Sequence, residues 1–276
     1  MTDLQLTNSP LPTPHSPSRL TVSNLTVRFP LGSGVVTALD GVSFELEAGE
    51  FCAIVGPSGC GKSTLLRAIA GLTEPSQGLT RIEAEDERRP AQAMVFQGTS
   101  VFPWMSVLRN AAYGLEMRGL DQPERERIAG ELLRQVGLGD FLNAYPSQLS
   151  EGMRQRVAIA RAFAMDPEVL LMDEPFGALD EQTRLVLQDE LLRIWEETGK
   201  TVVFVTHGID EAMILADRII VLSARPGATK ADIRVPFPRP RSIASVRFNR
   251  SAADRSIASR SVSELSSRAN STSVIR

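Results

Sequence analysis

One short loop constrains the fold of this chain more than any other part of its sequence. The loop lies between an unbroken apolar run, Phe51–Val55, and a segment with a helical pattern, residues 63–70. Glycines let such a loop wrap closely around phosphate oxygens, and the N-terminus of the next helix favours negative charge. A strand, a glycine-rich loop and a helix in this order are the context that a phosphate-binding loop needs. The loop and the start of the helix are Gly56, Pro57, Ser58, Gly59, Cys60, Gly61, Lys62, Ser63 and Thr64.

The lysine and the serine of this loop have separate expected roles. We expect Lys62 to reach the β- and γ-phosphates of a bound nucleotide, and the Ser63 hydroxyl to ligate Mg²⁺. The alternative is a glycine-rich turn with an incidental lysine, but every spacing position of the motif is filled. The loop alone fits GTPases, kinases, helicases and transporters, so other segments must decide between them.

Strand-like and helix-like segments alternate along the rest of the chain. Residues 20–29 and 37–46 alternate apolar and polar side chains, which is typical of an antiparallel pair of strands. A long amphipathic helix is predicted over 181–198, with Asp180 as its N-cap and Gly199 as its stop. Short apolar runs typical of buried parallel strands occur at 51–55, 93–96, 169–172, 202–205 and 219–222. The pattern predicts an α/β core with a parallel sheet.

Composition argues against several classes of protein. No apolar run approaches the roughly 20 residues that cross a bilayer, and residues 1–19 lack the pattern of a signal peptide. The net charge of −3 gives no basic footprint for a duplex-binding protein. Cys52 and Cys60 have neither metal-ligand nor disulfide-framework spacing. We therefore expect any action at a membrane to pass through a partner, and we expect no nucleic-acid partner.

Two adjacent carboxylates end one of the apolar runs. Asp173 and Glu174 follow residues 169–172 directly. Asp173 is expected to hold the Mg²⁺ shell, and Glu174 to polarise the attacking water, since metal-assisted phosphoryl transfer needs both functions. An acidic turn after a buried strand would look similar, but the phosphate-binding loop favours the catalytic interpretation.

The segment 149–156, Leu-Ser-Glu-Gly-Met-Arg-Gln-Arg, resembles the signature of the ABC ATPases, Leu-Ser-Gly-Gly-Gln at the start of a helix. Ser150 is expected to cap that helix and to donate to a γ-phosphate, while Gly152 allows close approach. The resemblance implies that this segment faces the nucleotide of a second subunit, so that a homodimer completes the site. Met153 replaces the final glutamine of the signature, and methionine there is familiar in the nitrate/sulfonate/taurine-type importers that this chain resembles.

Glu151 departs from the signature, because it replaces a glycine. We hypothesise that its negative charge lowers the affinity of the closed dimer for ATP. An unchanged ATP dependence of turnover in Glu151→Gly would contradict this hypothesis.

Four further residues resemble family positions. Gln97 matches the glutamine that senses Mg²⁺ and the attacking water, and His207 matches the histidine that contacts the γ-phosphate. Asp180 matches the loop that crosses the dimer seam, and Phe29 fits the aromatic that stacks on adenine. The alternatives are a surface glutamine, a packed polar histidine, an N-cap role for Asp180, which could hold simultaneously, and core packing of Phe29.

The resemblance covers roughly residues 20–240 and implies a P-loop ABC ATPase core, with an antiparallel β subdomain and an inserted helical lobe at about 99–165. It also implies transmembrane permease subunits, a periplasmic or extracellular substrate-binding protein, and a place on the cytoplasmic face of the inner or plasma membrane. Phe102 and Trp104 resemble the groove that receives the permease, although packing within the lobe is an alternative for either.

The ends of the chain fall outside this resemblance. Residues 1–19, rich in Pro, Ser and Thr, are predicted to be a disordered leader. The composition changes at Pro236, and we expect disorder in the Ser/Arg-rich tail at 241–276. Because the tail is basic, contact with anionic lipid or with the permease is an alternative.

The resemblance implies an ATPase that drives uptake of a small anion such as nitrate, a sulfonate or taurine. The segments Phe102-Pro-Trp104 and Ser223-Ala-Arg-Pro-Gly227 favour this group, while bicarbonate and small organic precursors stay open. One alternative is a soluble ABC ATPase that acts on nucleic acid or ribosomes, but the chain has no heptad run and no basic core. Another is a regulatory subunit that binds ATP without hydrolysing it, which the presence of Glu174 and His207 argues against.

Overall fold

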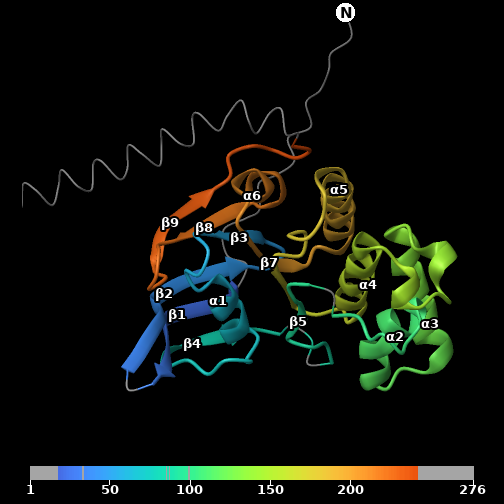
Figure 1. Ribbon diagram of the computed structural model, residues 1–276, viewed down its shortest axis with the longest axis horizontal. Coiled ribbons are helices and arrows are strands. Elements are labelled where there is room, and N and C mark those ends of the chain that lie inside the picture. The colour runs from blue at the N-terminus through green and yellow to red at the C-terminus, as the bar shows by residue number, and fades with distance from the viewer. Residues whose placement is uncertain (1–17, 33, 85, 87, 99, 242–276) are drawn as a thin grey trace, which may run out of the picture.

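The computed structural model describes residues 18–241 except positions 33, 85, 87 and 99. The described chain forms two sheets with one helix between them and further helices on the far side of the larger sheet (Figure 1). The predicted leader and tail therefore lie almost wholly outside the described residues. No helix in this part of the chain is both long and apolar enough to cross a membrane.

The smaller sheet is antiparallel and has the strand order β2-β1-β4. Its strands are β1 (Ser18–Leu31), β2 (Gly34–Glu47) and β4 (Gln77–Ile82). The later half of β2 alternates buried and exposed residues, because one face packs on the core and the other meets solvent. The two predicted strands of this sheet are present, and β4 is an addition to them.

The larger sheet has the order β5-β6-β7-β3-β8-β9 and is parallel except for its edge strand β9. Alternate residues of β3 enter two different cores: Phe51 and Ala53 face one, Cys52 and Ile54 the other. Burial on both faces explains the unbroken apolar runs of the sequence. The strands are β3 (Phe51–Val55), β5 (Gln92–Val95), β6 (Val169–Asp173), β7 (Thr201–Thr206), β8 (Arg218–Leu222) and β9 (Thr229–Arg234).

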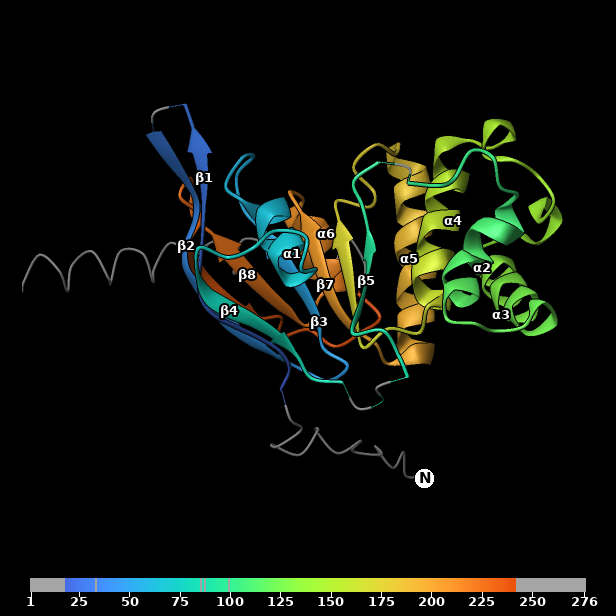
Figure 2. The same cartoon turned by 90° about the horizontal axis from the view of Figure 1, so that it is seen from below.

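Helices cover both faces of the larger sheet. Helix α1 (Lys62–Ile69) packs between the two sheets, and α5 (Glu181–Thr198) and α6 (Ile209–Leu215) lie on the opposite face (Figure 2). The bounds of α5 follow from its caps, as predicted: Asp180 accepts a hydrogen bond from the Thr183 N–H at 2.9 Å, and Gly199 ends the helix at φ 60°.

The strand-poor block of the sequence is helical. It contains α2 (Val107–Met117), α3 (Gln122–Gln135) and α4 (Glu151–Ala164), with short 3₁₀ turns at Gly139–Phe141 and Pro146–Gln148. These helices form a lobe beside α5 (Figure 2). The expected fold class, an α/β ATPase core with an antiparallel subdomain and an inserted helical lobe, is confirmed.

The chain after β9 packs back onto the larger core. Residues 235–241, which we call the C-terminal arm, pack against α6, and all of them except Arg241 precede the tail predicted at 241–276. The reason is that Val235 and Phe237 bury apolar surface and the arginines of the arm find carbonyl and carboxylate partners.

Candidate active site

Four neighbouring strands deliver the predicted site residues to one edge of the larger sheet. Gln97 follows β5, Asp173 ends β6 with Glu174 next to it, His207 follows β7, and the loop 56–61 follows β3. These strands are adjacent and parallel in the order β5-β6-β7-β3, so their carboxyl ends meet. Ligands of open α/β sheets bind at this edge.

The glycines of the phosphate-binding loop are required by its geometry. Gly61 has φ 103°, and a Cβ atom there would lie 2.8 Å from the Ala38 carbonyl oxygen. The Lys62 side chain is only 6% exposed, and its Nζ donates to the carbonyl oxygens of Gly56 at 3.0 Å and Pro57 at 3.2 Å. The loop therefore holds its own cation where a phosphate would approach.

Ser63 and Asp173 bring two oxygen ligands together. The Ser63 hydroxyl donates to Asp173 Oδ1 at 3.0 Å. Burial raises the pKa of Asp173, although the hydrogen bond from Ser63 acts in the opposite direction. Hydroxyl and carboxylate oxygens beside a phosphate-binding loop suit Mg²⁺, which is bound by few protein ligands together with substrate phosphates. Among the described residues, no group of three or more His, Cys, Asp or Glu could hold a metal.

Glu174 lies at the centre of the site. Its carboxylate is 3.4 Å from Gln97 Nε2, 3.3 Å from His207 Nδ1 and 3.9 Å from Lys62 Nζ. Its backbone N–H donates to Val205 on β7 at 3.0 Å, and its φ of 45° lies in the left-handed region. Such a conformation in a non-glycine residue costs of order 1–3 kcal/mol and is typical of functional sites.

The segments on either side of His207 are held by hydrogen bonds of residues that the sequence did not indicate. The His207 side chain is 62% exposed. The following N–H, of Gly208, donates to the Thr206 hydroxyl at 2.9 Å, and that hydroxyl donates to Glu211. Gln188 on α5 donates to the other oxygen of Glu211 at 2.8 Å. No sequence motif marks these residues, because their bonds join the end of β7, α5 and α6 in the folded chain.

The signature segment begins α4. Ser150 caps this helix, as predicted, by accepting from the Met153 N–H at 3.3 Å. A Cβ atom on Gly152 would lie 2.8 Å from the Thr183 methyl group, so this glycine also allows α4 to pack near α5. The Glu151 carboxylate accepts from Arg154 at 2.5 Å, within its own helix, and lines a cavity of about 410 Å³ together with Glu174.

The two phosphate-binding elements of one chain lie apart. Helix α1 continues from the phosphate-binding loop and α4 carries Ser150 at its start; both views place β5 between these helices (Figures 1 and 2). One chain therefore does not bring Ser150 and Lys62 to the same place.

Phe29 and Asp180 have the exposure that contact with a ligand or partner requires. The Phe29 ring is 42% exposed and belongs to neither core, so the alternative of core packing does not hold. Asp180 is exposed, and the hydrogen bond from the Thr183 N–H lowers the pKa of its carboxyl.

The loop that follows Gln97 presents an aromatic surface. Trp104 is 69% exposed, and its ring lies 5.5 Å from that of Phe102. Phe102 packs inward against Tyr113, with ring centroids 4.9 Å apart, so packing within the lobe accounts for Phe102 but not for Trp104. The buried Asn110 side chain bonds both the N–H and the carbonyl of Phe102 and fixes this loop.

Comparisons with known proteins agree with this site. A family model described as ABC transporter matches residues 39–177. The chain is 46% identical to a taurine import ATP-binding protein of Roseobacter denitrificans, over 79% of this chain and 82% of that protein. It is also 46% identical to a nitrate import ATP-binding protein of Synechocystis sp., over 74% and 78%. A dimeric bacterial ABC transporter cassette superposes with a TM-score of 0.70 at 35% identity, covering 79% of this chain and 100% of that one.

Proposed function

The chain belongs to the ABC transporter family as an ATP-binding, ATP-hydrolysing subunit, and we propose that it drives a membrane importer of a small anion. The observation that carries its chemistry is the position of Glu174, which contacts Gln97, His207 and Lys62 at the carboxyl edge of the sheet. A carboxylate there accepts a proton from the attacking water as the phosphoryl group is transferred.

In this mechanism the other residues offset charge and fix geometry. Lys62 leaves the carbonyl groups of its own loop and pairs with the β- and γ-phosphates, while His207 donates to the γ-phosphate. Gln97 orients the water beside Glu174. Mg²⁺, held by Ser63 and Asp173 with Gln97 nearby, would supply positive charge next to the phosphates.

A homodimer would complete each site. Ser150 and Gly152 would face the γ-phosphate held by the Lys62 loop of a second copy, with Asp180 at the seam and Phe29 stacked on adenine. The support is the position of β5 between α1 and α4 within one chain (Figures 1 and 2) and the likeness to a dimeric cassette. Residues 20–240 would form this ATPase domain, with its lobe at about 99–165.

The lobe would receive the permease. Trp104 is an exposed aromatic anchor on a loop that Asn110 fixes, as hot spots of interfaces commonly are. The same loop continues from Gln97, so movement of the lobe would follow the state of the nucleotide. The chain would then lie on the cytoplasmic face of the inner or plasma membrane, with a periplasmic or extracellular binding protein acting on the other side.

The relatives narrow the class of substrate. Relatives of this chain are named for taurine import and for nitrate import. Nitrate is a small anion, and taurine is a small zwitterion with a sulfonate group. We therefore propose a small anion such as nitrate, a sulfonate or taurine. No observation on the described residues favours the alternative of a soluble ATPase acting on nucleic acid or ribosomes.

The test is capture of partners by Glu174→Gln from solubilised membranes in the presence of ATP and Mg²⁺. Removing the base should hold the dimer closed around ATP, so a multispanning permease should be recovered and identified by mass spectrometry. Lys62→Ala, which should bind ATP poorly, is the matched control. Recovery of only soluble partners with Glu174→Gln would contradict the importer and leave the ATPase chemistry standing.

A further inference from the structure

The C-terminal arm covers the end of α6 that lies farthest from His207. Every second residue of the arm from position 236 is an exposed proline, whereas Val235 and Phe237 pack against the core on this side. The Val235 N–H donates to the Asp217 carbonyl at 2.8 Å. Figure 1 shows the chain leaving β9 and crossing over α6 toward α5. The arm is thus attached to α6 by packing and by hydrogen bonds.

Two arginines of the arm satisfy the carbonyl groups at the end of α6. A helix leaves its last carbonyls without partners inside the helix, and α6 has only 7 residues. The Arg241 guanidinium donates to three of these groups and Arg239 donates to a fourth. The carbonyls that accept are those of Met213, Ile214, Leu215 and Ala216.

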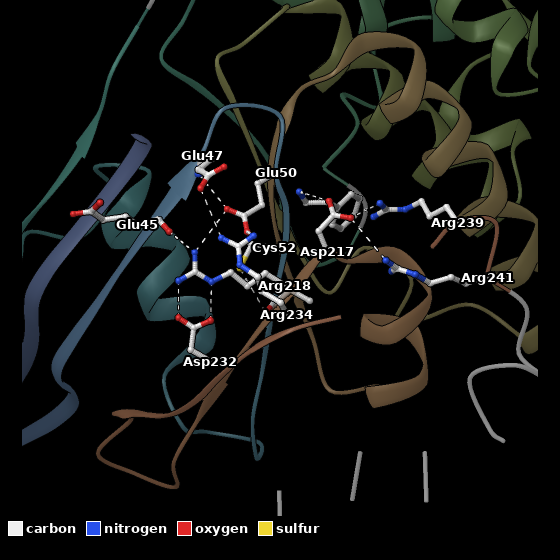
Figure 3. Close-up of polar contacts among 12 residues, drawn as sticks. Glu45, Glu47, Glu50, Cys52, Asp217, Arg218, Asp232, Arg234, Arg239 and Arg241 are labelled. Atoms are coloured by element: carbon white, nitrogen blue, oxygen red, sulfur yellow. Dashed lines mark hydrogen bonds and ion pairs between the residues drawn. The ribbon is translucent and has the colours of Figure 1, made fainter. Parts of the chain in front are cut away.

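Positive charge suits this place, because the C-terminus of a helix carries partial negative charge. Arg239 forms an ion pair with Asp217 (Figure 3) and lies 4.4 Å from the ring centroid of Trp195. Arg241 is 4% exposed and lies 3.8 Å from the same carboxylate of Asp217. Burial, and then the charge of Arg239, lower the pKa of Arg241 to about 10, so it is charged at neutral pH.

Helix α6 connects the amino end of the larger sheet, where the arm lies, to the active site at its carboxyl end. It begins just after His207 at the carboxyl end of β7 and ends just before Asp217 at the start of β8. At 1.5 Å per residue its length is about 10 Å. In its first turn, Glu211 accepts hydrogen bonds from Thr206 and Gln188. At its last turn, the carbonyl groups accept hydrogen bonds from the arginines of the arm.

We propose that Arg239 and Arg241 are positioning residues for ATP hydrolysis: by fixing the far end of α6, they keep His207 within reach of Glu174 and the γ-phosphate. The inference rests on the proposed role of His207. The phosphate-binding loop follows β3 and has no bond to the arm among the described residues. The arm should therefore act on turnover and leave ATP binding unchanged.

The first experiment is the ATPase kinetics of Arg241→Ala. We expect kcat to fall about tenfold, since small displacements of catalytic groups have effects of this size or larger, while KM for ATP stays within about twofold. Arg241→Lys should restore part of kcat, because lysine keeps the charge but lacks the second nitrogen that donates to the Phe237 carbonyl while Nη1 donates to α6. Arg234→Ala is the matched control: it removes an exposed arginine of β9 that pairs with Glu47 and Glu50 and does not touch α6.

Hydrogen exchange gives a readout that does not depend on turnover. Arg241→Ala should speed exchange at residues 209–216 and leave β3 and β6 unchanged. Faster exchange throughout the sheet would mean a general loss of stability and would overturn the positioning role.

A double-mutant cycle with His207→Ala tests the route of the effect. The two changes should be strongly non-additive in kcat if the arm acts through His207. Additive effects would overturn the inference. If His207→Ala lowers kcat and Arg241→Ala does not, the arm has no positioning role; if His207→Ala itself has no effect, the proposed role of His207 fails first.

Discussion

Both ends of the larger sheet carry charged side chains, but the two sets are arranged differently. At the carboxyl end, Glu174 meets its partners at 3.3–3.9 Å. At the amino end, Arg218 donates through two nitrogens to the Asp232 carboxylate at 2.7 and 2.5 Å and to the Glu45 carbonyl at 2.5 Å (Figure 3). One end has loose contacts around an open site, and the other has short bidentate contacts.

The difference separates charges kept for a ligand from charges that hold the fold. Bidentate arginine–carboxylate pairs are strong and fixed in geometry, which suits a joint between β8, β9 and the smaller sheet. The contacts of Glu174 are longer, so its partners can readily exchange them for contacts with a phosphate. Changes at Glu174 and its partners should therefore act mainly on chemistry, and changes at Arg218 and its partners mainly on stability.

The largest effect is expected from Glu174→Gln. The amide keeps the shape of the side chain but cannot accept a proton, so ATP turnover should fall by about 10²–10⁴-fold. ATP binding should persist, because Lys62 and the loop backbone are unchanged. Steady-state ATPase assays and equilibrium ATP binding check both parts. Glu197→Gln, an exposed carboxylate on α5 paired with Arg193, is the control and should behave as the wild type.

Arg218→Ala should have the largest effect on stability. It leaves the buried Glu50 without its Arg218 contact and Asp232 without its bidentate partner, which should cost about 3 kcal/mol of unfolding free energy. The kcat of the folded fraction should stay within about twofold of the wild type. Urea unfolding measures the first quantity. A stability loss no larger than that of Arg127→Ala, whose ion pairs on α3 are exposed, would remove the distinction between the two ends.

A smaller effect, opposite in sign, is expected from Asp173→Asn. Burial raises the folded-state pKa of Asp173 above the value of 3.8 for the unfolded chain. Between those two values the folded state binds more protons, so its stability falls as pH rises and the cost is complete above the folded pKa. Asparagine carries no charge. Asp173→Asn should therefore be more stable than the wild type at pH 7, by a margin that shrinks as pH falls toward 4, and should lose ATPase activity.

Asp86→Asn is the matched control for the sign of the stability change expected from Asp173→Asn. Hydrogen bonds from Arg88 lower the pKa of Asp86 to about 2, so its charge favours folding at neutral pH. Its replacement should not stabilise the protein, whereas Asp173→Asn should. A gain in stability at pH 7 with Asp86→Asn would show that the method does not separate the two environments.

The smallest effect is expected from Glu151→Gly. The Arg154 guanidinium already offsets the charge of Glu151, so removing the carboxylate should lower the ATP concentration for half-maximal turnover by only about twofold to threefold. Arg154→Ala with Glu151 retained should raise that concentration. An unchanged ATP dependence in both variants would mean that Glu151 stays away from the phosphate.

Sequence patterns predicted the parts of this fold that carry their own local signal. The buried run at β3 and the capped helix α5 have the bounds that the sequence suggested, because a β-branched or apolar run and a pair of caps are local features. Strands β4 and β9 and helix α6 were missed. They are short, and β4 is largely exposed, so pairing with β1 rather than its own sequence makes it a strand.

The site was predictable to the extent that motifs name residues. The contacts of Lys62, Ser63 and Glu174 join segments that the motifs had already marked. Motifs did not indicate that Glu211 would bond Thr206 behind His207, or that Arg241 would reach three carbonyls of α6. Both depend on tertiary placement, and a stretch rich in proline and arginine has no periodicity to reveal it.

The strand order also has a consequence for synthesis of the protein. Strand β3, which leads into the phosphate-binding loop, has both of its neighbours, β7 and β8, between residues 201 and 222. A growing chain must therefore keep an apolar strand without either partner until nearly all of the domain has left the ribosome. Ribosome-stalled chains that end before residue 201 should leave the loop open to protease and bind no ATP. Such a chain depends on chaperones, or on rapid completion, to avoid aggregation.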